Sequence, residues 1–188
     1  MIDLEQVELL PPAAAVVLGQ SQKSVNKAFD EGPLASRGKS RVLGGQELLY
    51  LSIYADLKEA GLLKWKNELR LKLYSSLKRA VSQDVDISLA DAVVVKVLAA
   101  KKSLLKQLKR LEAAERLVTS DPEIRGGEPV IRGTRIPVYL VGDLRNSGIP
   151  VEEVLEAYPT LSARKVEFAE IYARAFPRRG RRKKHPWH

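Results

Sequence analysis

The amino-acid sequence predicts a mainly α-helical α+β fold with small β-ribbons. Apolar residues recur three and four positions apart in several long stretches, which is the period of an amphipathic helix. Glycines and prolines separate these stretches from short alternating or β-branched segments, which is the pattern of small β-hairpins. The 188 residues, 45% of them hydrophobic, are enough for one or two domains with a buried core.

The N-terminal region begins with two short predicted helices. Pro11 and Pro12 suit the first turn of a helix, and Gly19 is typical of the residue that ends one. Ser21 is predicted to cap a second helix over residues 22–30, whose apolar residues share one face. Two short helices around a glycine-containing turn form the helix-turn-helix pattern.

The segment that follows predicts a small β-hairpin. Residues 32–46 contain Pro33, Gly38 and the pair Gly44-Gly45, and basic residues alternate around the central glycine. A hairpin in this place corresponds to the wing that often follows a recognition helix. Residues 1–64 are therefore predicted to form a winged helix-turn-helix-like DNA-binding region.

A recognition helix meets the DNA major groove with its first residues. The amides of Gln22 and Asn26 match adenine edges, whereas lysines and arginines bind phosphates. The candidate DNA-binding residues are Ser21, Gln22, Lys23, Asn26, Lys27, Arg37, Lys39 and Arg41. The alternative that the pattern leaves open is a plain helical hairpin with a solvated polar face.

Residues 65–117 predict a basic helix–strand–strand–helix connecting region. Leucines four apart indicate a helix at 65–81, and the apolar pattern indicates strands at 85–89 and 93–97, followed by a helix at 101–117. The leucines of this last helix, and those of another predicted at 46–60, supply either a dimer interface or an internal core. We expect a homodimer, because two half-sites multiply the specificity of operator binding.

Residues 118–176 predict a second small domain. Gly126-Gly127 and Gly133 separate short extended pieces, and three helices follow. Pro137 and Pro150 open the first two helices, and Ser162 caps the third. Residues 177–188 form a basic tail that is too charged to fold alone.

The net charge of +9 is concentrated in two places. Residues 178–188 hold six basic side chains and no acid, and residues 65–118 hold twelve basic side chains and six acids. The rest of the chain is slightly acidic. This distribution predicts partners with a polyanionic or acidic surface.

The residue types exclude most catalytic and metal chemistry. The chain has no cysteine, and its two histidines, His185 and His188, lie at the C-terminus. This argues against thiolate zinc sites, cysteine nucleophiles and histidine-based catalysis. We therefore expect no enzyme activity, no cofactor and no metal. A carboxylate metal nuclease built on Asp84 and Asp86 is kept as a minor hypothesis.

Gly38-Lys39-Ser40 does not form a phosphate-binding loop, because position 33 is proline where that motif requires glycine. No apolar run is long enough for a membrane span, and the N-terminus lacks the basic start of a signal peptide. We expect a cytoplasmic protein without a membrane partner.

The segment from Ser120 to Ala173 carries a long and specific motif. Its elements are Asp121-Pro122-Glu123-Ile124, Gly127, the run from Pro129 to Val138, and Tyr158-Pro159. With these residues it resembles the VapB-type antitoxin family described as domain of unknown function 433. The resemblance covers about residues 118–175, while residues 1–64 resemble winged DNA-binding domains more loosely.

The resemblance implies an antitoxin of a type II toxin–antitoxin system. Such an antitoxin binds a toxin encoded beside it, usually a PIN-like ribonuclease, and represses their shared promoter. It also implies a homeodomain-like three-helix module with a β-hairpin. A stand-alone DNA-binding transcriptional regulator without a toxin partner is the alternative.

An arginine-rich segment can pair bidentately with the clustered carboxylates of a PIN-like nuclease. The tail is therefore predicted to plug the toxin, and an exposed tryptophan is a typical interface anchor. The candidate toxin-binding residues are Arg178, Arg179, Arg181, Arg182 and Trp187. The competing interpretation is that this tail grips DNA.

Overall fold

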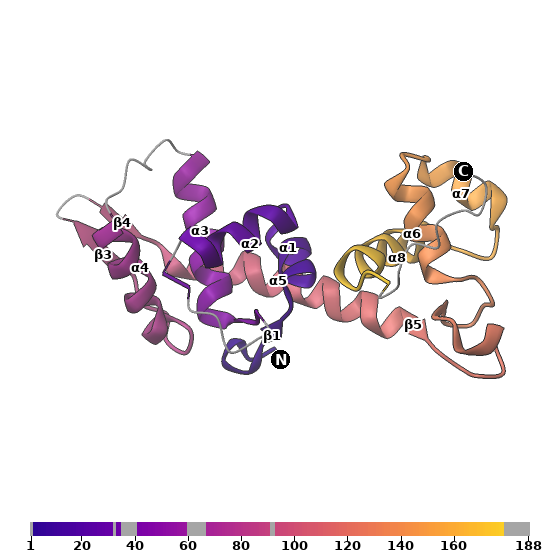
Figure 1. Cartoon of the computed structure of the whole chain (residues 1–188), viewed down its shortest axis with the longest axis horizontal. Coiled ribbons are helices and arrows are strands. Elements are labelled where there is room, and N and C mark those ends of the chain that lie inside the picture. Colours follow the sequence, from indigo (N-terminus) through magenta and orange to yellow (C-terminus); the bar gives the residue numbers. More distant parts are fainter. Residues whose placement is uncertain (1, 32, 35–40, 60–66, 91–92, 179–188) are drawn as a thin grey trace. The chain divides into compact units, whose positions relative to one another are not determined.

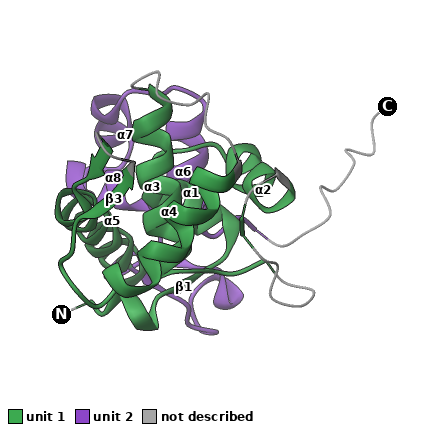
Figure 2. Ribbon diagram, turned by 90° about the vertical axis from the view of Figure 1, so that its left-hand side faces the viewer, with its two compact units in different colours: residues 1–117 green, residues 118–188 purple. Residues whose placement is uncertain are grey.

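The computed structural model describes residues 2–31, 33–34, 41–59, 67–90 and 93–178. The chain divides into two compact units, unit 1 from Met1 to Leu117 and unit 2 from Val118 to His188 (Figure 2). The described residues are mainly helical, and each sheet among them is a two-stranded antiparallel ribbon. The mainly helical α+β class predicted from the sequence is confirmed.

Unit 1 contains six helices and four strands within the described residues. In chain order they are η1 (Leu4–Gln6), β1 (Glu8–Leu9), α1 (Pro11–Leu18), α2 (Gln22–Glu31), β2 (Leu43–Gly44), α3 (Gly45–Glu59), α4 (Asn67–Ala80), β3 (Ile87–Ala90), β4 (Val93–Val95) and α5 (Val97–Leu117) (Figure 1).

The predicted pair of short helices, α1 and α2, is present. Prolines occupy the first two positions of α1, and Gly19 ends it with φ +64°, a left-handed conformation that glycine adopts without strain. Ser21 caps α2, since its Oγ accepts a hydrogen bond from the Ser24 N–H at 3.1 Å. Val25 is fully buried and fixes the inner face of α2.

Strand β2 lies at the end of the segment predicted as a wing. It pairs with β1 near the N-terminus, with Leu43 opposite Leu9 and Gly44 opposite Glu8. Residues 35–40, the centre of the predicted hairpin, lie outside the described residues. Gly45 follows directly, and a Cβ there would lie 2.2 Å from the Leu4 carbonyl oxygen, so only glycine fits.

Helix α3 is the centre of unit 1. It contacts α1, α4 and α5, and Leu48, Leu49 and Tyr50 are at most 1% exposed. On α5, Leu104, Leu108 and Leu111 are buried inside the same unit. Of the two roles considered for these leucine-rich helices, the structure shows an internal core.

The helix predicted at 101–117 begins four residues earlier than expected. Strand β4 ends at Val95, where the antiparallel ladder closes with Ile87 opposite Val95. Val97 starts α5 and is fully buried against the core. The β-branched run at 93–97 predicted a strand up to Val97, and this prediction is wrong for Val97, which belongs to α5. Burial in the tertiary structure outweighs the weak strand propensity of a single residue.

Unit 2 contains a small ribbon followed by three α-helices within residues 118–178. Its elements are β5 (Val118–Thr119), η2 (Arg125–Gly127), β6 (Val130–Ile131), α6 (Val138–Asn146), α7 (Val151–Ala157) and α8 (Ala163–Ala175). Pro137 and Pro150 precede α6 and α7, and the Ser162 Oγ accepts the N–H of Lys165 at the start of α8. The predicted starts of all three helices are confirmed. No described helix in either unit is long and apolar enough to cross a bilayer.

Helices α6 and α8 pack closely at Gly142. A Cβ at this position would lie 2.3 Å from the Cβ of Ala173 and 3.4 Å from the carbonyl oxygen of Ala169. Both alanines are buried. The two helices can approach this closely only because three small residues meet, and this contact holds the core of unit 2 together.

We expect Gly142→Ala to destabilise the protein, although alanine is the better helix former by about 1 kcal/mol. The added methyl group must push α6 away from α8, and such overpacking costs about 1–3 kcal/mol. Urea unfolding of the full chain, followed by circular dichroism, measures the change.

The matched control is Asp143→Ala on the exposed side of the same helix. It raises helix propensity without touching α8 and is expected to leave stability within about 0.5 kcal/mol. Equal stability of Gly142→Ala and the parent chain would contradict the close-packing argument.

Candidate nucleic-acid interface

The first turns of α2 carry most of the predicted DNA-binding residues. Ser21, Gln22 and Lys23 are exposed at its start, and Lys27 is exposed one turn beyond Lys23. Asn26 is half-buried on the flank of the helix. Because residues four apart are neighbours on a helix surface, Lys23 and Lys27 form one basic stripe. The structure therefore brings together two lysines and the exposed amide of Gln22.

Arg41 lies against α2 rather than out on a wing. Its Nη1 donates to the Asn26 carbonyl oxygen at 3.1 Å, and its Nη2 pairs with the Asp30 carboxylate at 2.6 Å. The guanidinium also stacks over the Phe29 ring at 5.3 Å. Arg41 thus braces the C-terminal half of α2. Two other predicted contacts, Arg37 and Lys39, lie outside the described residues.

The sequence did not indicate that three basic side chains from different helices lie together near α2. A hollow of about 200 Å³ is lined by Lys27 of α2, Lys58 of α3 and Arg70 of α4. Only Lys27 belonged to the predicted interface. Lys58 and Arg70 are ordinary helix-surface residues in the sequence, and no local signal indicates that their helices bring them together beside α2.

The base of the tail is held within unit 2. The Arg178 guanidinium lies 4.6 Å from the centre of the Tyr139 ring and pairs with Glu128 at 3.4 Å. The Tyr139 hydroxyl donates to the Phe176 carbonyl oxygen at 2.8 Å. Burial raises the pKa of Tyr139, and the nearby Arg178 charge opposes that rise. The other predicted toxin contacts, Arg179, Arg181, Arg182 and Trp187, lie outside the described residues.

The carboxylates considered for a metal site are paired with lysines. Asp84 lies 3.1 Å from the Nζ of Lys101, and Asp86 lies 2.6 Å from the Nζ of Lys96. Asp91, a third acid close to these two in the sequence, is outside the described residues. Among those that are described, no three carboxylate or imidazole side chains converge as metal ligands.

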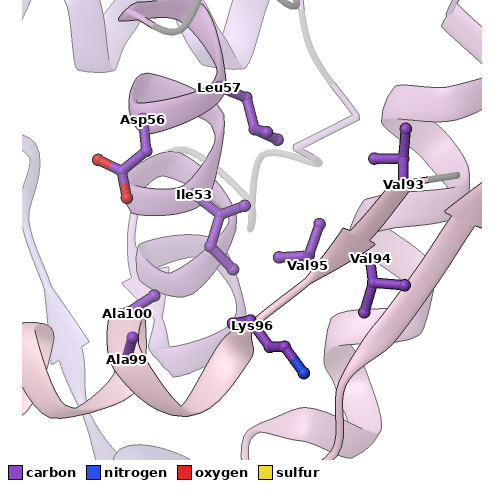
Figure 3. Close-up of a pocket in the computed structure, with 9 residues that line it drawn as sticks. All are labelled: Ile53, Asp56, Leu57, Val93, Val94, Val95, Lys96, Ala99 and Ala100. Atoms are coloured by element: carbon purple, nitrogen blue, oxygen red, sulfur yellow. The ribbon is translucent and has the colours of Figure 1, made fainter.

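A second hollow in unit 1 is apolar (Figure 3). It measures about 440 Å³ and lies between the C-terminal half of α3, strand β4 and the start of α5. Ile53 and Leu57 project from α3 toward Val95, and Asp56, which also lines the hollow, projects from α3 in a different direction (Figure 3). Burial raises the pKa of Asp56, and repulsion from Glu59 adds to the rise. This groove holds one carboxylate and one lysine, so its character differs from that of the basic hollow.

Comparisons with known proteins give similarities to parts of this chain. "Uncharacterized protein y4eO" of Sinorhizobium fredii (strain NBRC 101917 / NGR234) is 53% identical over 78 residues, which is 42% of this chain. The match spans about a third of that relative, 35% of its length. A crystal structure of Rv2018 from Mycobacterium tuberculosis aligns with 90% of this chain and 98% of its own, at 14% identity and a TM-score of 0.34.

The C-terminal part gives the family match. The sequence model of the family described as "Protein of unknown function (DUF433)" matches residues 118–173. This range agrees with the segment whose motif resembles that family and with the start of unit 2. Unit 2 therefore carries a DUF433 domain.

Proposed function

We propose that this protein is an antitoxin of a type II toxin–antitoxin system. It neutralises a PIN-like ribonuclease toxin and represses its own operon by binding DNA. In this proposal unit 1 contains a winged helix-turn-helix-like reader, and unit 2 is a homeodomain-like antitoxin module. The observation that carries the DNA half is the exposed, Ser21-capped start of α2 with its adjoining lysines.

The geometry of α2 suits a recognition helix. Val25 anchors one face in the core, and the opposite face presents Lys23 and Lys27 to solvent. Arg41 fixes the later turns of α2 through Asp30, so the reading surface is pre-organised. In this proposal the exposed amide of Gln22 reads a base edge, and Lys23 and Lys27 contact phosphates.

The toxin half of the proposal is supported by the DUF433 match and by the tail. Arg178 stacks on Tyr139 and pairs with Glu128, and these contacts hold the first residue of the basic run against unit 2. We therefore assign the entry into a carboxylate-lined toxin site to Arg179, Arg181 and Arg182, with Arg178 as their anchor. Guanidinium groups suit this role, because they pair bidentately with carboxylates.

A stand-alone transcriptional regulator is the second candidate. The α2 surface lies wholly in unit 1, and the proposed DNA binding by this surface does not depend on a toxin partner. A neighbouring reading frame with clustered acidic residues, whose product is retained by this protein in a co-expression pull-down, supports the antitoxin. Absence of such a frame favours the regulator. Magnesium- or manganese-dependent cleavage of nucleic acid by the purified chain would instead support the nuclease hypothesis.

Gln22→Ala is expected to reduce discrimination between the protein's own upstream duplex and a scrambled duplex. Loss of one base contact costs about 1–3 kcal/mol of specificity. Lys23→Ala is the contrasting variant: it should weaken both duplexes equally, because a phosphate contact carries no sequence information. Fluorescence anisotropy with both labelled duplexes gives the ratio. Unchanged discrimination in Gln22→Ala would remove this residue from the reading surface.

Replacing Arg179, Arg181 and Arg182 together with glutamine is expected to abolish inhibition of the co-expressed toxin while leaving operator binding largely intact. Arg178 is kept, so that its contacts in unit 2 persist. The matched variant with three lysines retains the charge but loses the planar fork, and should inhibit only partly. Toxin ribonuclease activity on a reporter RNA is the readout. If the tail grips DNA instead, the glutamine variant inhibits normally and the salt dependence of operator binding becomes shallower.

We expect a homodimer at micromolar concentration, measured by light scattering. One α1–α2 pair covers one half-site, and two copies are needed to read a palindrome. The leucines of α3 and α5 are used internally, so the dimer contact must lie elsewhere on the chain. A monomer that still binds a palindromic duplex tightly would refute this prediction.

A further inference from the structure

The apolar groove of unit 1 runs along an edge of strand β4 (Figure 3). Val93, Val94 and Val95 all line it, and Lys96 follows them. Because successive side chains of a strand point to opposite faces, a groove that touches every residue of β4 follows the strand edge and does not lie over one face. None of the described lining residues belongs to β3, the strand that pairs with β4, so this edge is the one away from β3.

This edge of β4 offers both backbone groups and apolar surface to a partner. Each sheet among the described residues has two strands, so no described strand covers the second edge of β4. An edge strand presents N–H and C=O groups that can pair with another chain. Val94 is 53% exposed, and Leu98 in the first turn of α5 is 40% exposed. A chain that paired with β4 would therefore also remove apolar side chains from water.

The opposite wall of the groove is helical. Ile53 and Leu57 project from α3 toward Val95, and Ala99 and Ala100 line the groove at the start of α5. An extended peptide that adds a strand to a sheet gains affinity from main-chain hydrogen bonds and specificity from pockets for its alternate side chains. Here the wall suits apolar side chains. A single segment would occupy the 440 Å³ beside β4, whereas a second copy pairing through β4 would bring two strands into the same space.

The α3 side of the groove is acidic. Asp56 lines the groove. Burial raises the pKa of Asp56, and repulsion from Glu59 adds to the rise. Lys58 lies between these two acids in the sequence, but it lines the hollow beside α2 and not this groove. A cation brought by a partner would oppose both effects on Asp56.

The lysines near β4 and the start of α5 are paired with other acids. Lys96 lies 2.6 Å from the Asp86 carboxylate, and Lys101 lies 3.1 Å from that of Asp84. Their charges are thus largely balanced within β3, β4 and α5. The charge that a bound segment would have to match is that of the α3 acids.

We propose that the apolar groove binds an extended segment of a partner protein, which adds a strand to β4. The segment places β-branched or other apolar side chains against Ile53 and Leu57, and it brings a lysine or arginine to Asp56. This inference does not depend on the proposed DNA contacts of α2 or on the proposed toxin contacts of the tail. It gives unit 1 a protein-binding surface of its own.

The first test uses a labelled peptide of alternating valine and threonine with one lysine, and fluorescence anisotropy with the full chain. Two isomers of this peptide carry N-methyl groups on alternate sets of backbone amides. Only every second amide of an added strand faces the edge strand. One isomer should therefore lose binding while the other keeps it. Equal binding of the two isomers would overturn the proposed strand addition.

The second test changes the groove. Ala99→Phe introduces a ring from an exposed helical position and should weaken binding of the unmethylated peptide about tenfold. Asp56→Asn should weaken it about two- to fivefold, and should not affect a peptide with glutamine in place of lysine. The matched control is Glu68→Gln, an exposed acid of α4 that is not among the described lining residues, and it should bind as the parent does. Circular dichroism checks that each variant keeps its helices.

Three results would overturn the inference without affecting the proposed reading of DNA by α2. The first is a parent chain that binds neither the lysine nor the glutamine peptide. The second is parental affinity in Ala99→Phe. The third is a dimer of the parent chain that Ala99→Phe converts to a monomer in light scattering, because a second copy would then occupy the groove.

Discussion

The burial of helix α3 is the constraint on which the rest of unit 1 depends. Leu48, Leu49 and Tyr50 are removed from water between α1, α4 and α5, and burial of such side chains is worth about 1.5–3 kcal/mol each. The same packing sets the place of every surface feature discussed above. It brings α2 and α3 together around one hollow, it brings Arg70 of α4 over Tyr54, and it leaves an apolar groove open beside β4.

The proposed function of unit 1 depends on where its charged side chains lie. Acids and bases that meet in unit 1 are paired locally, as in Asp84 with Lys101 and Asp86 with Lys96. Such exposed pairs contribute little to stability. Lys27, Lys58 and Arg70 line one hollow beside α2, and cations gathered in this way are what a polyanionic partner would recognise. The proposal is therefore a protein that acts by occupying other macromolecules and not by turnover.

In unit 2 the packing depends on the close approach of two helices at small residues and not on large side chains. Gly142 and Ala173 allow α6 and α8 to touch, and Tyr139 links α6 to the end of α8 through the Phe176 carbonyl. Arg178 then closes over the same tyrosine. The start of the tail is thereby tied to the core of the DUF433 domain, so a partner that binds the tail is held close to this unit.

The sequence by itself determined the helical class, the starts of α1, α2, α6, α7 and α8, and the DUF433 segment. These features depend on local chemistry, since prolines, glycines and a capping serine act within one turn of the chain, and a family motif is written in consecutive residues. Only the tertiary structure decided the partner of β2, the early start of α5 and the internal role of the leucine-rich helices. The same holds for the meeting of Lys27, Lys58 and Arg70, because burial and contact between distant segments are properties of the packed chain that no local pattern contains.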